Sequence, residues 1–401
     1  MGQKTTVKQA SEPSYVLKDL DKAAEVALFY GFRAIKSPCI IKEDIEKTAF
    51  LNDEKKMPEY RPEIFPRGEE KASVIRTYLD WNVLEAKHPV MLYYRRPLGG
   101  ASERRPINEH HSALEIIGSA SSVCEAIAIK TASAILSDHG YKDLIVDINS
   151  IGDKDSITRL ELELSSYIRK HINFVPAELR TSFRKNPFDA ISCEDKGWVS
   201  SRERMPQAMS CLSESSINNF KEVLEYLESL EIPYRLVHNL VPNRQYCSHT
   251  FFQIRDNVDE NFVFAVGTRH NHLTRKLGFK RDVPIMSVNL RFKKPAVMPK
   301  LFFKNRPQPK FYFIQLGLKA KLKSLTVIEM LRQAQIPLHH SLTRDQFVDQ
   351  LSGAENTGVP FIIIMGQKEA LENTVVVRHM ATRVQETVPL GDLVRHLSKI
   401  K

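Results

Sequence analysis

The sequence predicts an α+β fold in which an antiparallel sheet flanked by helices precedes a small α/β domain. First, four strand-like runs follow one another closely between residues 234 and 292 without helices between them, which is typical of an antiparallel sheet. Second, strands and helices alternate after residue 310, which indicates a small α/β unit with a mostly parallel core. Third, every charged residue between 291 and 310 is basic and prolines are interleaved, which predicts a linker between the two parts.

In the first part, the elements alternate between helical and strand-like spacing of apolar residues. Helical spacing predicts a helix that ends at Gly31, and the Pro-rich, charged stretch from 48 to 70 predicts an irregular loop. Asp155 is the expected N-cap of a helix through Leu160 and Leu164. The expected helices are 17–30, 123–136, 155–167 and 213–230, and the expected strands are 90–94, 113–117, 144–149, 234–241, 250–255, 262–267 and 284–292.

The second part adds strands at 311–316, 359–365 and 374–379 and helices at 320–333, 343–351 and 390–397. Residues from about 172 to 213 are polar and contain prolines, which predicts an insertion into the first part. The expected domains are a flexible N-terminus (1–14), a core (15–295), a basic linker (296–309) and a C-terminal α/β domain (310–401).

Charge and cysteine usage limit the class of protein. The formal net charge of +10 favours an anionic partner, nucleic acid first, with a merely well-solvated surface as the alternative. The five cysteines are scattered and never form C-x-x-C, which argues against a disulfide framework and a zinc site and fits a reducing cytoplasm. No apolar run approaches the length of a membrane span. We therefore expect a cytoplasmic protein with no metal and no membrane partner.

Several segments, in order along the chain, are similar to the histidyl-tRNA synthetase family. Residues 30–38 (YGFRAIKSP) resemble its first class II motif, residues 92–94 and 111–118 resemble the two strands of motif 2, and residues 359–380 resemble its anticodon-binding domain. The resemblance implies a class II synthetase core with a C-terminal anticodon-binding domain, a homodimer, and tRNA as partner. For an active enzyme it also implies ATP and Mg²⁺.

Some positions that the resemblance makes functional are retained. Formation of an aminoacyl adenylate brings a carboxylate to an ATP phosphate, so cations and hydrogen-bond donors must offset the repulsion of two anions. The resemblance makes Arg291 the motif 3 arginine that binds ATP phosphate. It gives substrate-binding positions to Glu115, to Tyr246 and, by a looser match, to Glu69. His111 also falls on a substrate-binding position, but there it replaces a glutamine of the family. For Arg291 the first residue of a basic linker remains an alternative, and for Glu115 an ordinary surface carboxylate.

Other functional positions are replaced. Pro242 stands where the family has a catalytic arginine, and proline carries no charge and no backbone donor. Arg244 lies two residues further on and would share the same face of a strand, so we expect it to be a partial substitute. The motif 2 arginine has no clear counterpart, and Arg104 is the candidate for its role. The glycine-rich turn of the family is reduced to Gly267 followed by Thr268, whose branched side chain would crowd a ligand.

Basic residues of the linker and the C-terminal domain favour contact with the tRNA backbone. The expected contacts are Lys304, Lys319, Lys323 and Arg378, with a solvated helix face as the alternative. The sequence thus favours a histidyl-tRNA-synthetase-like protein that binds tRNA and whose amino-acid activation is weakened or lost. A working histidine–tRNA ligase is the second hypothesis. A regulatory paralogue of histidine metabolism ranks last, because that family lacks the C-terminal domain that is present here.

Overall fold

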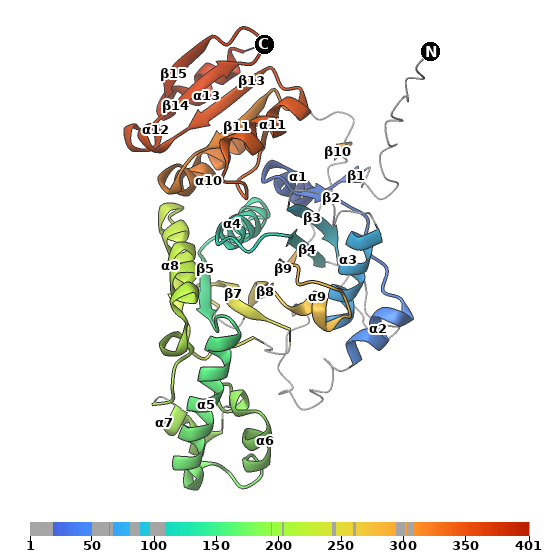
Figure 1. The fold of residues 1–401 in the computed structure, drawn as a ribbon, viewed down its shortest axis with the longest axis vertical. Helices are drawn as coiled ribbons and strands as arrows, with labels where there is room; N and C mark the ends of the chain where they lie inside the picture. The colour runs from blue at the N-terminus through green and yellow to red at the C-terminus, as the bar shows by residue number, and fades with distance from the viewer. Residues whose placement is uncertain are drawn as a thin grey trace.

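The structure, a computed structural model, describes residues 19–49, 64, 67–80, 89–96, 109–193, 195–202, 204–242, 246–259, 262–293, 301–302 and 308–400. A large sheet with its helices forms the middle of the molecule (Figure 1). The C-terminal domain lies on one side of it, and a helical extension projects from the opposite side.

The large sheet contains eight strands in the order β2-β3-β4-β9-β8-β7-β5-β6. All pairs from β3 to β5 are antiparallel, whereas β2 and β6 pair in parallel at the two edges. The predicted α+β fold is therefore confirmed. The strands are β2 (Arg33–Ala34), β3 (Val90–Arg95), β4 (Glu109–Ile117), β5 (Leu144–Ser150), β6 (Tyr234–Leu236), β7 (Ser248–Asp256), β8 (Val263–His270) and β9 (Ile285–Lys293).

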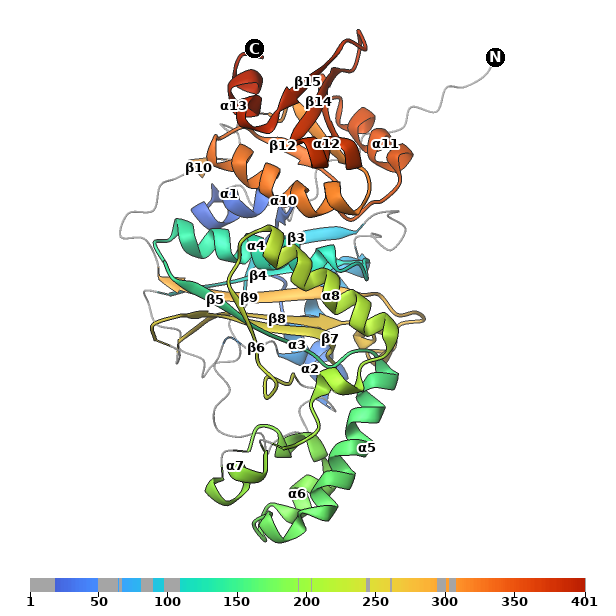
Figure 2. The same cartoon turned by 90° about the vertical axis from the view of Figure 1, so that its left-hand side faces the viewer.

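The two faces of this sheet differ in character. Successive side chains of a strand point to opposite faces, so Leu114 and Ile116 of β4 lie on one face and Glu115 on the other. The first face is covered by α1 (Lys22–Phe29), α4 (Val123–Asp138) and α8 (Glu214–Ser229) (Figure 2). On the second face, α3 (Gly68–Asp80) packs over β3, β4 and the start of β9, with α2 (Lys42–Thr48) and α9 (Leu273–Lys276) close by. Helices α2, α3 and α9 were not predicted, because α2 and α9 are short and the charged first turn of α3 lies in the stretch predicted to be a loop.

The predicted insertion is a helical extension with an apolar core of its own. It contains α5 (Lys154–Lys170), α6 (Arg180–Lys185) and α7 (Lys196–Arg202). Trp198 is fully buried there and donates its indole hydrogen to the Ala190 carbonyl at 2.8 Å. The prediction that Asp155 caps α5 is wrong: Asp153 accepts from the Ser156 amide at 2.9 Å, and Asp155 lies inside the first turn.

The C-terminal sheet has the strand order β12-β11-β13-β14-β15. Its first three strands are parallel and its last two pair antiparallel, so the sheet is mixed. Strands β12 and β15 and helix α12 are too short to show a clear period and were not predicted. The elements of this domain are β11 (Phe311–Gln315), α10 (Leu318–Gln333), β12 (Leu338–His340), α11 (Phe347–Thr357), β13 (Phe361–Met365), α12 (Gln367–Glu372), β14 (Thr374–His379), β15 (Gln385–Pro389) and α13 (Leu390–Ser398). Outside this domain, two short strands, β1 (Asp19–Leu20) and β10 (Leu301–Phe302), pair with each other near α1.

Helix α10 joins the C-terminal domain to the helices of the large sheet. Arg332 bonds Glu329 within α10 at 2.9 Å and reaches Asp138, at the end of α4, at 2.8 Å. Tyr30, which follows α1, donates its hydroxyl to Glu329. Burial opposes ionisation of Glu329, but the hydrogen bonds from Arg332 and Tyr30 and the charge of Lys130 outweigh it and lower its pKa to about 2. This network fixes α10 against α1 and α4.

We expect Glu329→Gln to lower the free energy of unfolding by about 2 kcal/mol at pH 7, because Arg332 and Tyr30 lose a charged acceptor. The folded-state pKa of Glu329 lies below its ordinary value of 4.5, so its contribution is present above pH 4.5 and is lost as the pH falls toward 2. Urea unfolding at several pH values measures this. The exposed Glu355→Gln on α11 is the control, and equal effects of the two substitutions would contradict the prediction.

Candidate functional site

The second face of the large sheet is centred on the buried carboxylate of Glu115. Glu115 has no exposed surface, and it accepts hydrogen bonds from three side chains. The Lys71 ammonium lies 2.5 Å from its Oε1, and the Tyr94 hydroxyl donates to the same oxygen at 3.0 Å. Ser287, opposite Glu115 in the β4–β9 register, donates its hydroxyl to Oε2. Charge and hydrogen-bonding capacity of this carboxylate are thus met within the chain.

Lys71 reaches this carboxylate because it lies on the apolar side of α3. Residues three, four and seven positions after it (Val74, Ile75 and Tyr78) are buried against the sheet, and Lys71 itself is only 2% exposed. A buried ammonium requires an opposite charge, since an unpaired ion in a protein interior costs several kcal/mol. Glu115 supplies that charge, and the pair connects α3 to the centre of the sheet.

A second buried pair lies one residue earlier on α3. Arg96, just after β3, donates from Nη2 to both carboxylate oxygens of Glu70 at 2.8 and 3.0 Å, and Arg67 donates to the same carboxylate at 2.7 Å. Burial opposes ionisation of Glu70, but the positive charges of Arg96 and Arg67 together outweigh it and lower the pKa of this carboxylate. The first turn of α3 is therefore held to the sheet by two adjacent ion pairs.

A neutral imidazole lies in the same buried region. His270 donates Nδ1–H to the Tyr246 carbonyl at 3.0 Å, so its Nε2 accepts from the Thr268 hydroxyl at 2.8 Å. Complete burial, followed by the charge of Lys71, lowers the pKa of His270 to about 3. The Cys247 sulfur is 3.8 Å from Nδ1, but that nitrogen is already a donor and does not act as a base for the thiol.

The structure brings together only some of the predicted substrate-binding residues. The Tyr246 ring stacks on His270 with ring centroids 5.6 Å apart, close to the Lys71–Glu115 pair. Glu69, in the first turn of α3, lies 3.7 Å from Arg67. His111 is buried on β4 and lies 3.3 Å from Glu109. Glu69 and His111 thus contact other partners, and substrate binding by these residues stays a prediction.

In the described part of the chain, the predicted catalytic arginines are not brought together in one site. Arg291 donates from Nε to the Val263 carbonyl at 2.7 Å, and its guanidinium lies over the Phe262 ring at 4.2 Å. Arg104 and Arg244 lie outside the described residues. Pro242, at the position of the family's catalytic arginine, is buried. Contact of Arg291, Arg104 or Arg244 with ATP phosphate stays a prediction.

The segment predicted as a reduced glycine turn lies in strand β8, and Gly267 and Arg269 point away from this site. A side chain at Gly267 would meet the Phe252 ring at 2.1 Å, so that ring occupies the space beside the glycine. Arg269 points to the helical face, where it pairs with the buried Glu125 of α4. Gly267 and Arg269 therefore serve contacts within the fold, whereas Thr268 lies on the face with His270.

The described residues contain no preformed metal cluster, and two arginines of this face are engaged within the chain. Within these ranges no three His, Cys, Asp or Glu side chains are grouped so as to hold a metal ion. The guanidinium groups of Arg96 and Arg291 on this face are engaged with Glu70 and the Val263 carbonyl. A triphosphate requires several cations directed at it, and Arg96 and Arg291 are directed at partners within the chain.

The predicted tRNA-binding residues differ in their exposure and in their contacts within the chain. Lys319 is exposed at the start of α10, and Arg378 is half-buried on β14. Lys323 donates to the Ala370 carbonyl at 2.6 Å and to the Asn373 side chain, so it caps α12, and its contact with tRNA stays a prediction. Lys304 lies outside the described residues.

Four residues at the centre of the site were missed: Lys71, Tyr94, His270 and Ser287. Lys71 carried a signal in the sequence, because a lysine at the start of an apolar helical stripe is rarely buried without a partner. The others carried none, since a serine or tyrosine on an apolar strand does not reveal its cross-strand neighbour.

Comparison with known proteins finds similarity in the C-terminal domain, in the fold and in the sequence. Residues 311–400 match the family described as an anticodon binding domain. The crystal structure of apo histidyl-tRNA synthetase from S. aureus has a TM-score of 0.50 and 21% identity, covering 94% of this chain and 93% of that one. The fold is thus that of a class II aminoacyl-tRNA synthetase with an anticodon-binding domain.

The sequence relatives agree with this class. A histidine–tRNA ligase from Listeria monocytogenes is 27% identical over 350 residues, which are 84% of this chain and 81% of the relative. Another from Dehalococcoides mccartyi is 24% identical over 400 residues, 94% of each chain. This chain is thus similar to histidine–tRNA ligases over most of its length. In the described ranges, no helix is both long enough and apolar enough to span a membrane.

We expect Lys71→Met and Glu115→Gln each to lower the free energy of unfolding by about 3–5 kcal/mol, because each leaves a buried ion without its partner. The double variant should lose at least about 2 kcal/mol less than the sum, and a double-mutant cycle in urea measures the difference. The exposed pair Lys368→Met with Glu372→Gln is the control, for which we expect additivity. Additive effects at Lys71 and Glu115 would show that the two residues are not paired.

Proposed function

We propose that this histidyl-tRNA synthetase-like protein binds tRNA and does not activate an amino acid. The observation that carries the proposal is the Lys71 ammonium 2.5 Å from the buried Glu115 carboxylate. Amino-acid activation needs carboxylates that hold the substrate in attack geometry. The resemblance gives one such position to Glu115, and here that carboxylate already has an ammonium partner from its own chain.

As a partner for Glu115, the Lys71 ammonium has an entropic advantage over the ammonium of a free amino acid. Lys71 is held by α3, so forming its bond to Glu115 needs no loss of the translational freedom that a free amino acid would lose. A substrate would have to displace Lys71, and the displaced ammonium would be left in a region where it is 2% exposed. Tyr94 and Ser287 occupy further acceptor positions of the same carboxylate. These contacts favour exclusion of the substrate.

Two further features support loss of activation. His270 places a neutral imidazole beside Lys71, so both an ammonium and an imidazole of this chain occupy the face that the resemblance assigns to a histidine substrate. Pro242 replaces the arginine of the family and offers no charge to a phosphate. With no activation, the protein requires neither ATP nor Mg²⁺.

The tRNA-binding part of the proposal rests on the C-terminal domain. An anticodon-binding domain implies tRNA as a partner, and residues 311–400 match such a domain. Lys319 is exposed and Arg378 partly exposed on it, and the chain carries a net charge of +10. By the same resemblance, we propose a homodimer that acts in the cytoplasm.

The alternative is a working histidine–tRNA ligase, which retention of Glu115 and Arg291 favours. For the protein to be a working ligase, α3 must move so that Lys71 leaves Glu115, and Arg104 or Arg244 must supply the missing cations. A regulatory paralogue is less consistent with the matched C-terminal domain.

ATP–pyrophosphate exchange separates the two. We expect the purified protein to give no exchange above background with any of the twenty amino acids, while the Listeria monocytogenes ligase serves as the positive control. We also expect tRNA binding that weakens steeply with salt, since basic side chains release counterions from the phosphates. Histidine-dependent exchange would overturn the proposal.

A control for the tRNA arm compares two exposed lysines. Lys319→Glu should weaken tRNA binding, whereas Lys142→Glu, in the turn between α4 and β5, should leave it unchanged. Equal losses of tRNA affinity in the two variants would indicate that tRNA binding depends only on the net charge of the protein.

Removal of the internal ammonium gives a second, independent prediction. Lys71→Ala should leave a buried carboxylate and a space that a small amine can fill, so methylammonium or ethylammonium should raise the melting temperature of this variant. Tetramethylammonium, which has charge but no N–H donors, should not do so, and neither should either amine with Lys71→Met. Stabilisation of the wild-type protein by the same amines would show that Glu115 is accessible without the substitution.

A further inference from the structure

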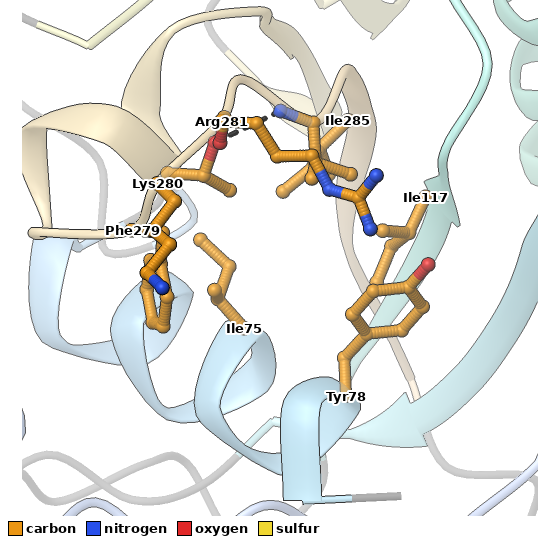
Figure 3. Close-up of a pocket in the computed structure, with 9 residues that line it drawn as sticks. Ile75, Tyr78, Ile117, Phe279, Lys280, Arg281 and Ile285 are labelled. Atoms are coloured by element: carbon orange, nitrogen blue, oxygen red, sulfur yellow. Dashed lines mark hydrogen bonds between the residues drawn. The ribbon is translucent and has the colours of Figure 1, made fainter. Parts of the chain in front are cut away.

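A preformed cavity of about 440 Å³ lies on the second face of the large sheet, beyond the Lys71–Glu115 pair. It is bounded by α3, by the end of β4 and the start of β9, and by the loop from α9 to β9 (Figure 3). Ile117 and Ile285, which face each other in register, form its floor two residues beyond Glu115 and Ser287. Its volume falls in the range of about 300–1,000 Å³ that is usual for small-molecule sites.

The interior of the cavity is apolar. Ile75, Ile117, Val283, Ile285 and the ring of Phe279 line it. The Thr274 hydroxyl is already used, because it accepts from the Val283 amide at 2.9 Å and donates to the Arg281 carbonyl at 3.1 Å. The walls therefore select an apolar body.

The loop that closes the cavity is held in place independently of any ligand. Asp282 lies 3.2 Å from His272 and 3.5 Å from Arg275, so this acidic residue is paired with α9 and its neighbour. The two hydrogen bonds of Thr274 fix the loop backbone. The cavity thus needs no rearrangement to form.

The mouth of the cavity is cationic. Lys280 and Arg281 are exposed, and no acidic residue is among the side chains that line it. Figure 3 shows Arg281 extending toward Tyr78 on one side, with Lys280 beside Phe279 on the other. An anionic group at the mouth would meet these charges while its apolar portion fills the interior.

We infer that this cavity binds a small amphiphile with an apolar body and one anionic end, such as a medium-length carboxylate. Binding there would also act on the neighbouring site: Ile75 lies one helical turn after Lys71, so an occupant would hold α3 in the position that pairs Lys71 with Glu115. The inference rests on the cavity alone and does not depend on the proposed loss of activation.

Calorimetric titration with three eight-carbon probes tests it. Octanoate should bind about tenfold more tightly than octan-1-ol, and octylammonium should bind more weakly than both, because only the carboxylate is attracted to Lys280 and Arg281. Equal affinity of octanoate and octan-1-ol, or no binding of either, would overturn the inference.

Variants of the same protein locate the binding. Lys280→Glu combined with Arg281→Glu should lower octanoate affinity about tenfold and strengthen octylammonium binding, and Ile75→Phe should abolish binding of all three probes by filling the cavity. Lys142→Glu is the matched charge control and should change nothing. Unchanged octanoate binding in the double variant would overturn the inference. So would sedimentation showing that octanoate binds only when a dimer dissociates, since the cavity would then belong to an interface between two copies.

Discussion

The ion pair between Lys71 and Glu115 is the contact on which the second face of the large sheet depends. It joins a helix that begins in a charged segment to the middle of an antiparallel sheet, and both charges lie almost entirely out of water. The adjacent Glu70–Arg96 pair repeats this connection one residue earlier. Because a buried ion without its partner is costly, these two pairs fix both the register and the height of α3 above the sheet. The cavity between α3 and the β4–β9 ladder follows from that position.

The Lys71–Glu115 pair is the place where we expect this protein to differ in chemistry from relatives whose fold it shares. The sheet, the helices that cover it and the C-terminal domain keep the architecture of a histidyl-tRNA synthetase. Tyr30, Asp138, Glu329 and Arg332 hold the two parts together through contacts far from Glu115. A carboxylate paired within the chain is thus compatible with this fold and with a complete C-terminal domain. The proposed loss of activation concerns the second face of the large sheet, whereas the proposed tRNA binding concerns the C-terminal domain.

The sequence was sufficient for the fold because apolar periodicity marks long elements such as α4, α8 and β9, and because a run of strands without helices specifies an antiparallel sheet. It was insufficient for α3, whose first turn is rich in charge and resembles a loop until the partners of Glu70 and Lys71 are known. Glu115 was identified through resemblance, whereas its bonds to Tyr94 and Ser287 depend on strand register, which no local pattern reveals. For Lys323 the charge was visible in the sequence, but its capping contact with α12 was not.

The most direct test of this account is a crystal structure of the protein grown with a large excess of histidine. We expect the Lys71 ammonium to lie within hydrogen-bonding distance of Glu115, with Tyr94 and Ser287 on the same carboxylate and no histidine bound there. Density for a histidine bonded to Glu115, with α3 displaced and Lys71 turned away, would contradict this expectation. It would instead support a working histidine–tRNA ligase.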